Sequence, residues 1–488
     1  MGPLPARFAA RMRELLGAEA EELFAALDAP REPAVRLNPL RGDPAALAAA
    51  LPWPSRAVPW CPAGRLVAAE SAEVAADPLN DAGVYYLQDP AAMAVAEAVA
   101  PAPGELVVDL AAAPGGKTTH LAALAGDAGL VVSNDVDERR ARALLGNVER
   151  LGVTSAVVTC ARPERLTAAL GGACHAVLLD APCSGEGMFR RSPAAREAWT
   201  EAGVERHAEL QRRLVAAAAD LVRPGGRLVY STCTFDPREN EAVVLWLLAR
   251  RPDLELEPLD LPGAADAAPF GLPGAARLWP HRSPGDGHFV ARLRRAADAA
   301  GAPAGVGARG GSAGRRRAHG RPGRSGSGRG ERAAGTLDPA TRTAWDAFAA
   351  EHLAPGWSAA ALEGRLARYG ERLLLLPERF RPLPGVHVLR AGLHLADVRA
   401  SGQRAELRPA HALAMAPSLA QGAWSGPRLE LSGDDGALES YRQGGAFAAA
   451  GVPDGYALVT HGGFALGWAA CRGGTARSLL PRGLRRAP

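Results

Sequence analysis

Several residue types are rare or absent in this 488-residue sequence, and each absence excludes something. Isoleucine is missing and Lys117 is the only lysine, a bias that we attribute to GC-rich coding. A chain with this bias uses arginine at every position where arginine can replace lysine. The one lysine that is kept therefore indicates a position that needs a compact ammonium group on a flexible stem. The six cysteines show no Cys-x-x-Cys spacing, which argues against a zinc site and a disulfide framework, so we expect no bound metal.

Long apolar runs are also lacking. No stretch of roughly 18 apolar residues is free of charge and turn formers, so we expect no membrane span. The N-terminus carries Arg7, Arg11, Arg13 and Glu14 and has no apolar core or cleavage signal, which argues against a secretory peptide and favours a cytoplasmic protein. The net charge is only +4, so any affinity for nucleic acid must come from local patches.

The length predicts about three domains. Residues 1–82 are predicted to form a small α/β domain, with a helix over Phe8–Leu27 and a short strand followed by a turn within Ala34–Leu40. In residues 83–295, short apolar strands alternate with helices. This pattern predicts a doubly wound, Rossmann-like α/β core whose parallel strands are covered on both faces.

The remainder of the chain divides in two. Residues 296–335 are Gly-, Ser- and Arg-rich, which predicts a disordered linker that is either a spacer or an RNA-binding arm. Residues 336–488 are predicted to form a second folded unit of α+β type, with helices near 337–352 and 359–366 followed by several strands.

The segment VVDLAAAPGGKTTHLA (Val107–Ala122) predicts a strand, a tight turn and a helix. Two glycines let the backbone approach a ligand closely, but GxGxxG is absent, which disfavours a dinucleotide. A second strand ends at Asp135, where a carboxylate can accept hydrogen bonds from ribose hydroxyls. Since parallel strands bind ligands at their carboxyl ends, one crevice is expected. Its candidate cofactor-binding residues are Asp109, Ala111, Ala112, Ala113, Pro114, Gly115, Gly116, Lys117, Asp135 and Asp180.

Two cysteines follow predicted strands at this same edge. Cys183 lies in DAPCSGEGMFRR and Cys233 in YSTCTFDPRENE. Neighbouring strand ends can bring both thiols to one pocket, whereas an isolated buried cysteine is usually inert. Covalent chemistry through a thiolate needs such a cysteine and a second group that handles protons.

The stretches AAAPGGKT, DAPCSGEGMFRR and YSTCTFDPRENE resemble the motifs of the Nop/Sun family of RNA 5-cytosine methyltransferases. The resemblance implies a class I methyltransferase core that uses S-adenosyl-L-methionine. It implies that Cys233 is the nucleophile that attacks C6 of the cytosine and that Cys183 assists elimination. It also implies that Asp135 binds the ribose and that Asp180 and Lys117 lie beside the cofactor and the target base.

The GEGMFRR run after Cys183, YYLQDPAAM (Tyr85–Met93) and LWPHRSPGDGHFVARL (Leu278–Leu293) are similar to the RsmF branch of this family, and the end of the chain, RSLLPRGLRR (Arg477–Arg486), is similar to the C-terminal region of that branch. This similarity implies a PUA-like, RNA-binding C-terminal region, 16S rRNA or the small ribosomal subunit as partner, and a monomer. One departure concerns TCARPERL (Thr159–Leu166), which lacks the aspartate that many relatives place near the adenine. The adenine-side contact is therefore left unassigned.

Candidate RNA-binding residues follow the first cysteine motif and also lie in the N-terminal domain. They are Arg190, Arg191, Arg206, Arg212, Arg213, Arg36, Asn38 and Phe189. Each has a structural alternative, namely a solvated helix face, a turn or the core. Three other functions stay open: a tRNA cytosine-5 methyltransferase, a DNA enzyme with Cys183 as nucleophile, and a non-catalytic RNA-binding factor for ribosome assembly.

Overall fold

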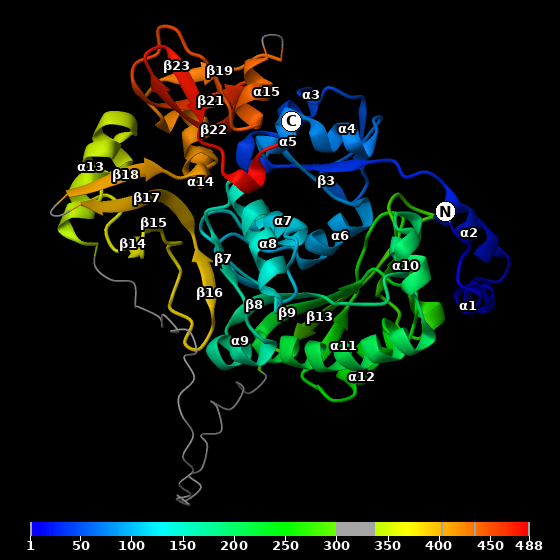
Figure 1. Ribbon diagram of the computed structural model, residues 1–488. Coiled ribbons are helices and arrows are strands. Elements are labelled where there is room, and N and C mark those ends of the chain that lie inside the picture. Colours follow the sequence, from blue (N-terminus) through cyan, green and yellow to red (C-terminus); the bar gives the residue numbers. More distant parts are fainter. Residues whose placement is uncertain (1, 299–336, 402–403, 434–435, 487–488) are drawn as a thin grey trace, which may run out of the picture.

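The structure is a computed structural model that describes residues 2–298, 337–401, 404–433 and 436–486 (Figure 1). The predicted linker, from residue 299 onward, lies outside the described residues. No helix within the described ranges is both long and apolar enough to cross a membrane.

The N-terminal unit is an antiparallel sheet of order β2-β3-β1-β4 preceded by two helices. The sequence predicted one helix over Phe8–Leu27, and this is wrong, because Gly17 adopts a left-handed φ of 58° that breaks it in two. The apolar sides of both helices pack against Phe189 and Trp199 of the next unit. The elements are α1 Ala6–Leu16, α2 Ala20–Asp28, β1 Ala34–Leu37, α3 Pro44–Ala49, β2 Ser55–Val58, β3 Cys61–Val67, α4 Ser71–Ala76, α5 Pro78–Asp81 and β4 Tyr85–Leu87.

The central unit confirms the doubly wound prediction. Its strands β9-β8-β5-β6-β7 are parallel neighbours, with β13 added antiparallel to β9. Helices α6, α7 and α8 lie on one side of this sheet and α9, α11 and α12 on the other (Figure 1). Strand runs such as Leu106–Asp109 are almost wholly apolar because both faces are covered.

The bounds of the helices in this unit are α6 Pro90–Val99, α7 Gly116–Ala125, α8 Glu138–Arg150, α9 Pro163–Leu170, α10 Pro193–Ala198, α11 Glu201–Leu221 and α12 Glu241–Leu248. Its strands are β5 Leu106–Asp109, β6 Leu130–Asn134, β7 Ala156–Thr159, β8 Cys174–Asp180, β9 Val222–Thr232, β10 Leu254–Glu257, β11 Ala265–Asp266, β12 Ala276–Leu278 and β13 His288–Arg295.

The C-terminal part forms two sheets, of order β14-β15-β17-β18 and β19-β21-β22-β23-β20. Strand β16 of this part belongs to neither of these sheets. It pairs with β7 and so extends the central sheet. The helix predicted at 359–366 is wrong: the chain forms turns there, and Gly364 has a φ of 76° that a helix does not tolerate.

The helices of this part are α13 Pro339–His352, α14 His411–Ala414 and α15 Ala437–Arg442. Its strands are β14 Leu366–Tyr369, β15 Arg372–Leu375, β16 Val388–Ala391, β17 Leu393–Ser401, β18 Arg404–Pro409, β19 Arg428–Glu430, β20 Ala446–Ala448, β21 Gly455–His461, β22 Phe464–Arg472 and β23 Thr475–Ser478.

The end of the described chain returns to the N-terminal unit, near α5 (Figure 1). Arg442 and Arg486 each bind the Asp81 carboxylate, both at 2.9 Å. The C-terminal part is therefore anchored on both of the preceding units, through Asp81 and through β16.

Candidate active site

Two cysteine thiols meet at the carboxyl edge of the central sheet. Cys183 follows β8, Cys233 follows β9, and these strands are parallel neighbours. The two Sγ atoms lie 3.4 Å apart, although the residues are 50 positions apart in the sequence. The structure thus brings together the two cysteines that the sequence singled out.

Hydrogen bonds hold the two cysteine loops against each other. The Glu239 carboxylate, beyond Cys233, accepts from the Ser184 backbone N–H at 3.0 Å and from the Gln211 amide at 2.8 Å. The Ser184 and Thr234 hydroxyls, which neighbour the two cysteines, share a hydrogen bond of 2.8 Å. These contacts fix the separation of the sulfurs without using either thiol.

Asp180 and Lys117 form an ion pair beside the thiols. Lys117 Nζ lies 2.7 Å from Asp180 Oδ2, and the Ser231 hydroxyl donates to Asp180 Oδ1 at 2.7 Å. Burial opposes the charge on Asp180, but the Lys117 ammonium outweighs it and holds the pKa of that carboxyl well below its usual range. The single lysine therefore stays protonated against a carboxylate that stays ionised.

The environment separates the acidities of the two thiols. A hydrogen bond from Cys183 lowers the pKa of Cys233; burial opposes this shift, and the charges of His288 and Lys117 favour it. The same hydrogen bond, together with burial, raises the pKa of Cys183 well above its usual value. Cys233 is therefore the thiol that ionises first, and Cys183 remains protonated beside it.

His288 is a site residue that the sequence reasoning did not single out. It begins β13, whose next residue pairs with Thr232 at the end of β9. Its Nε2 lies 3.8 Å from Asp180 Oδ1, and neither ring nitrogen makes a hydrogen bond although the side chain is only 7% exposed. The signal was present in PGDGHFVARL (Pro284–Leu293), but no local spacing links that stretch to the thiols.

The glycine turn lies where the sequence placed it, between β5 and α7. Gly115 has a left-handed φ of 110°, and a Cβ there would lie 2.9 Å from the Leu144 side chain. The loop is fixed from the next strand, because Asn134 accepts from the Ala112 N–H at 2.7 Å and its side chain donates to the Leu110 carbonyl at 3.2 Å.

Two buried aspartates border this turn. Asp109 accepts from the Thr118 hydroxyl at 2.7 Å, while its Oδ1 has no hydrogen-bond partner. Burial raises the pKa of Asp109 to about 7. Asp135, at the end of β6, accepts the Asp137 N–H, and its Oδ2 makes no hydrogen bond but lies 3.4 Å from Arg140. Carboxylate oxygens are therefore available on two adjacent strand ends.

Buried side chains of the N-terminal unit contact this turn and the helix that follows it. Arg36 is buried and donates to the Gly116 carbonyl and, at 2.7 Å, to the Thr119 hydroxyl of α7. Asn38 is also buried and donates to the carbonyls of Gly83 and Leu151 at 2.9 Å. The two residues predicted as RNA contacts therefore hold the units together, and their buried side chains are engaged by protein groups.

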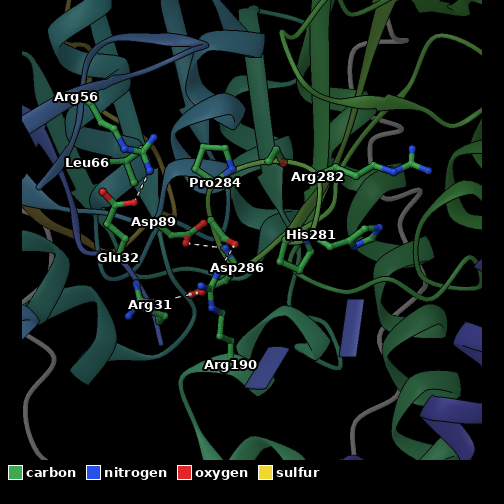
Figure 2. Close-up of a pocket in the computed structure, with 13 residues that line it drawn as sticks. Arg31, Glu32, Arg56, Leu66, Asp89, Arg190, His281, Arg282, Pro284 and Asp286 are labelled. Carbon is green, nitrogen blue, oxygen red and sulfur yellow. Dashed lines mark hydrogen bonds and ion pairs between the residues drawn. The ribbon is translucent and has the colours of Figure 1, made fainter. Parts of the chain in front are cut away.

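A charged pocket of about 330 Å³ lies between the N-terminal unit and residues 280–286. Figure 2 shows arginines around two facing carboxylates, with Asp286 donating its backbone N–H to Asp89 at 2.9 Å. Asp286 lies 3.2 Å from Arg31, and burial followed by the charge of Asp89 raises its pKa to about 6. The guanidinium groups that line the pocket belong to Arg31, Arg56, Arg190 and Arg282.

The remaining RNA candidates separate into exposed and buried groups. Arg191, Arg206 and Arg213 are exposed and Arg212 is half-buried. Phe189 has no exposed surface and packs edge-on against Phe8 at 5.0 Å, so the suggestion that it stacks on a base is wrong.

One cluster with metal-ligand chemistry occurs among the described residues, although the sequence predicted no metal site. Cys61, Glu97 and His120 bring ligand atoms within 4.8 Å of one another. His120 Nε2 already binds Glu97 Oε1 at 3.0 Å, and the Arg36 cation acts on all three groups. A further cation is disfavoured beside that buried charge.

Four family models match consecutive parts of the chain. They are described as the N-terminal domain of 16S rRNA methyltransferase RsmF (residues 4–90), 16S rRNA methyltransferase RsmB/F (96–294), the RsmF rRNA methyltransferase first C-terminal domain (347–416) and the methyltransferase RsmF PUA domain (428–486). The fold predicted from the sequence, with its PUA-like C-terminal region, is thereby confirmed.

Similar proteins agree with these models. Ribosomal RNA small subunit methyltransferase F of Klebsiella pneumoniae is 37% identical over 309 residues, which are 60% of this chain and 64% of that protein. The chain thus spans somewhat less than two thirds of the curated relative. The corresponding protein of Escherichia coli O7:K1 is 36% identical, over 60% of this chain and 63% of that protein.

Solved structures show the same central fold. A methyltransferase homolog from Pyrococcus horikoshii is 34% identical with a TM-score of 0.54, over 59% of this chain and 94% of that one. NSun6 from the same organism, at 24% identity and a TM-score of 0.54, shares the fold over 60% of this chain and 98% of its own. The four models follow one another along the chain, and the paired thiols and the glycine turn lie within residues 96–294, the part of the chain that is similar to the 16S rRNA methyltransferase RsmB/F family.

Proposed function

We propose that this protein transfers a methyl group from S-adenosyl-L-methionine to carbon 5 of a cytosine in RNA, with Cys233 as the nucleophile. The observation that carries the proposal is the 3.4 Å approach of two sulfurs beside the Lys117–Asp180 ion pair. Addition to a ring needs one thiol, and the elimination that follows needs a second group that handles protons. The pair of thiols supplies both at one edge of the sheet.

The residues around the glycine turn fit S-adenosyl-L-methionine. Asp109 and Asp135 each present a buried carboxylate oxygen without a hydrogen bond, which suits hydroxyl and amino donors of a nucleoside. Gly115 leaves room where a Cβ would collide with Leu144, and no phosphate-binding GxGxxG is present. We assign binding to the Ala111–Lys117 turn together with these two aspartates and Asp180. When bound, the cofactor supplies an electrophilic methyl group.

Carbon 5 of cytosine is a weak nucleophile until C6 is attacked. Cys233, as the more acidic thiol, forms the bond from sulfur to C6 and makes C5 nucleophilic. After methylation, the C5 proton is transferred to the sulfur of Cys183, which has released its own thiol proton to water once Cys233 is bonded to C6. The electrons of the C5–H bond restore the double bond to C6, and the electrons of the C6–S bond return to the Cys233 sulfur. Cys183, 3.4 Å from that sulfur, assists this elimination.

Asp180 and Lys117 orient the target base in this proposal. Their ion pair is partly exposed, with 15% of the Lys117 side chain and 27% of the Asp180 side chain accessible. A carboxylate held ionised accepts hydrogen bonds from an amino group, and the ammonium donates to a ring acceptor. The pair therefore offers one hydrogen-bond acceptor and one donor, which match the amino donor and the ring acceptor on the edge of a cytosine.

The proposed RNA is 16S rRNA of the small ribosomal subunit, because the curated relatives are named for that activity. The target base must leave its stack to reach Cys233. The pocket in Figure 2 lies close to Cys233, because Asp286, which lines the pocket, and Cys233 both place their backbone carbonyls against Gly187. The arginines of this pocket would therefore bind backbone phosphates near the target base. We propose that residues 1–82 and 336–488 contribute further RNA contacts.

The test is a methyl-transfer assay with labelled S-adenosyl-L-methionine. Purified small ribosomal subunits, free 16S rRNA and bulk tRNA are offered in parallel, and the product nucleosides are separated. We expect 5-methylcytidine in ribosomal RNA. Label only in tRNA would keep the chemistry and overturn the substrate, whereas cofactor binding without label on any RNA would favour an assembly factor that has lost catalysis.

A further inference from the structure

His288 is a buried titratable side chain at the thiol edge, and the proposed function gives it no role. It is 7% exposed, and both ring nitrogens lack a hydrogen bond. An imidazole that loses water without gaining a hydrogen bond is costly in a folded protein, so this group calls for a functional explanation.

The strand register places His288 at the same edge of the sheet as the reacting groups. Pairing of β13 with β9 sets Phe289 opposite Thr232, so His288 lies beside the residue that follows, Cys233. Its Nε2 is 3.8 Å from Asp180 Oδ1, close enough for the carboxylate to stabilise an imidazolium but too far for a hydrogen bond. A small movement would close that gap.

The charged and titratable groups around His288 come from four segments. Asp180 is the last residue of β8, Lys117 extends from α7, and the two cysteines occupy the loops after β8 and β9. In its own segment, Asp286 turns instead toward Asp89 and Arg31. The negative charge nearest to His288 is thus Asp180, which Lys117 already holds ionised.

We propose that His288 accepts the proton that the Cys233 thiol loses when its sulfur attacks the cytosine. This inference rests on the proposed function and adds a third proton-handling residue to it. The S–H bond breaks, the proton moves to an imidazole nitrogen, and the electron pair left on sulfur forms the bond to C6. On elimination, the electrons of the C6–S bond return to sulfur, and the imidazolium gives the proton back.

Cys183 does not fill this role in the free protein. It donates a hydrogen bond to Cys233 and is itself the weaker acid, so it stabilises the thiolate but removes no proton from it. Lys117 is protonated by its contact with Asp180 and is equally unable to accept. Asp180 is ionised but is already paired with Lys117 at 2.7 Å, so among the described residues of this edge His288 is the base to which we assign the proton.

The experiment measures the reactivity of the Cys233 thiol, without RNA or cofactor. Full-length protein is alkylated with iodoacetamide over a range of pH, and the peptides containing Cys183 and Cys233 are quantified separately by mass spectrometry. In the wild type, Cys233 should react well below the pH expected for an ordinary thiol. In His288→Phe the Cys233 profile should move to higher pH, with alkylation about tenfold slower at neutral pH.

Two further variants make the result specific. His411→Phe is the matched control, because His411 is half-buried and its two ring nitrogens are also buried without hydrogen bonds, but it begins α14 in the C-terminal part. Its Cys233 profile should match the wild type. If His288→Phe fails to fold by circular dichroism, His288→Gln keeps a polar side chain without the base and should show the same shift.

A profile of His288→Phe or His288→Gln that superimposes on the wild type would overturn the assignment. The two proposals fail separately. An unmethylated RNA panel with a shifted alkylation profile would sink the proposed function and keep His288 as the base for Cys233. Normal methylation with an unshifted profile would do the reverse.

Discussion

At the scale of single residues, the site depends on charges that share one buried edge. Lys117 keeps Asp180 ionised, and a hydrogen bond from Cys183 makes Cys233 the more acidic of two equivalent side chains. Sequence alone cannot rank the two thiols, because each follows a strand and a turn. Their order of ionisation comes from neighbours on other strands.

Replacing the nucleophile should separate binding from chemistry. In Cys233→Ala, methyl transfer to RNA should fall below detection, while S-adenosyl-L-methionine binds with unchanged affinity because the Gly115 turn is intact. Calorimetry measures the binding and the labelled assay measures the transfer. Residual turnover in this variant would remove Cys233 from the nucleophile's role.

Replacing the second thiol should trap an adduct. In Cys183→Ala, attack at C6 and methylation proceed but elimination stalls, so a covalent protein–RNA complex should accumulate and survive denaturing electrophoresis. Cys174→Ala is the control, since that thiol is buried within β8. Normal turnover of Cys183→Ala, without an adduct, would contradict the elimination role.

Asp109 should give stability a measurable dependence on pH. Its pKa rises from 3.8 to about 7 on folding because the carboxyl is buried. The folded state therefore binds this proton more tightly than the unfolded state, so the contribution is fully present below about pH 4 and is lost as pH rises through 7. In Asp109→Asn this destabilisation, on the order of 4 kcal/mol above pH 7, should be absent.

The measurement compares urea unfolding of the wild type and Asp109→Asn at pH 4 and pH 8. The variant should gain stability relative to the wild type at the higher pH. An equal difference at both values would show that Asp109 does not titrate in this range.

At the scale of elements, the turn between β5 and α7 needs its glycines for two reasons. Gly115 has a φ of 110°, and a Cβ there would lie 2.9 Å from Leu144 of α8. The sequence indicated close approach to a ligand, and the structure adds close approach to a neighbouring helix.

Gly115→Ala should therefore weaken both the fold and cofactor binding. Left-handed backbone strain costs about 1–3 kcal/mol, and the collision adds to it by moving the turn. Gly126→Ala is a matched control at the other end of α7, with a φ of 65° and no atom within 4 Å of the added Cβ. It should lose stability through strain alone and keep its cofactor affinity, measured by calorimetry.

At the scale of the whole molecule, three units are joined by partly buried polar contacts and by a strand pairing. Arg36 links the N-terminal sheet to the turn before α7, β16 extends the central sheet, and Asp81 receives Arg442 and Arg486 from the C-terminal part. The N-terminal and C-terminal parts are thus fixed relative to the thiols.

Asp81→Asn should loosen the C-terminal part. Two guanidinium groups would lose their shared carboxylate, at a cost of about 1–3 kcal/mol, because both are partly buried. Limited proteolysis should cut the C-terminal part faster. The control is Glu439→Gln, which removes an exposed partner of Arg442 at 3.5 Å and should leave the rate of proteolysis unchanged. Equal rates for the two variants would contradict the role of Asp81 in anchoring the C-terminal part.

Local patterns in the sequence determined the strands of the central sheet, the glycine turn and the position of both cysteines at strand ends. They could do so because apolar periodicity and turn residues act over a few neighbouring positions. The wrong predictions were also local: a helix continued through Gly17, and another was placed over turns near Gly364.

Only the tertiary structure decided which distant segments meet. It hydrogen-bonded Arg36 to the carbonyl of Gly116, 80 residues away, paired β16 with β7, and placed His288 at the edge of the sheet where the thiols lie. It also buried Phe189, which the sequence allowed as a base-stacking residue. Such contacts depend on how sheets and helices pack across the whole chain, and no spacing within a single segment encodes them.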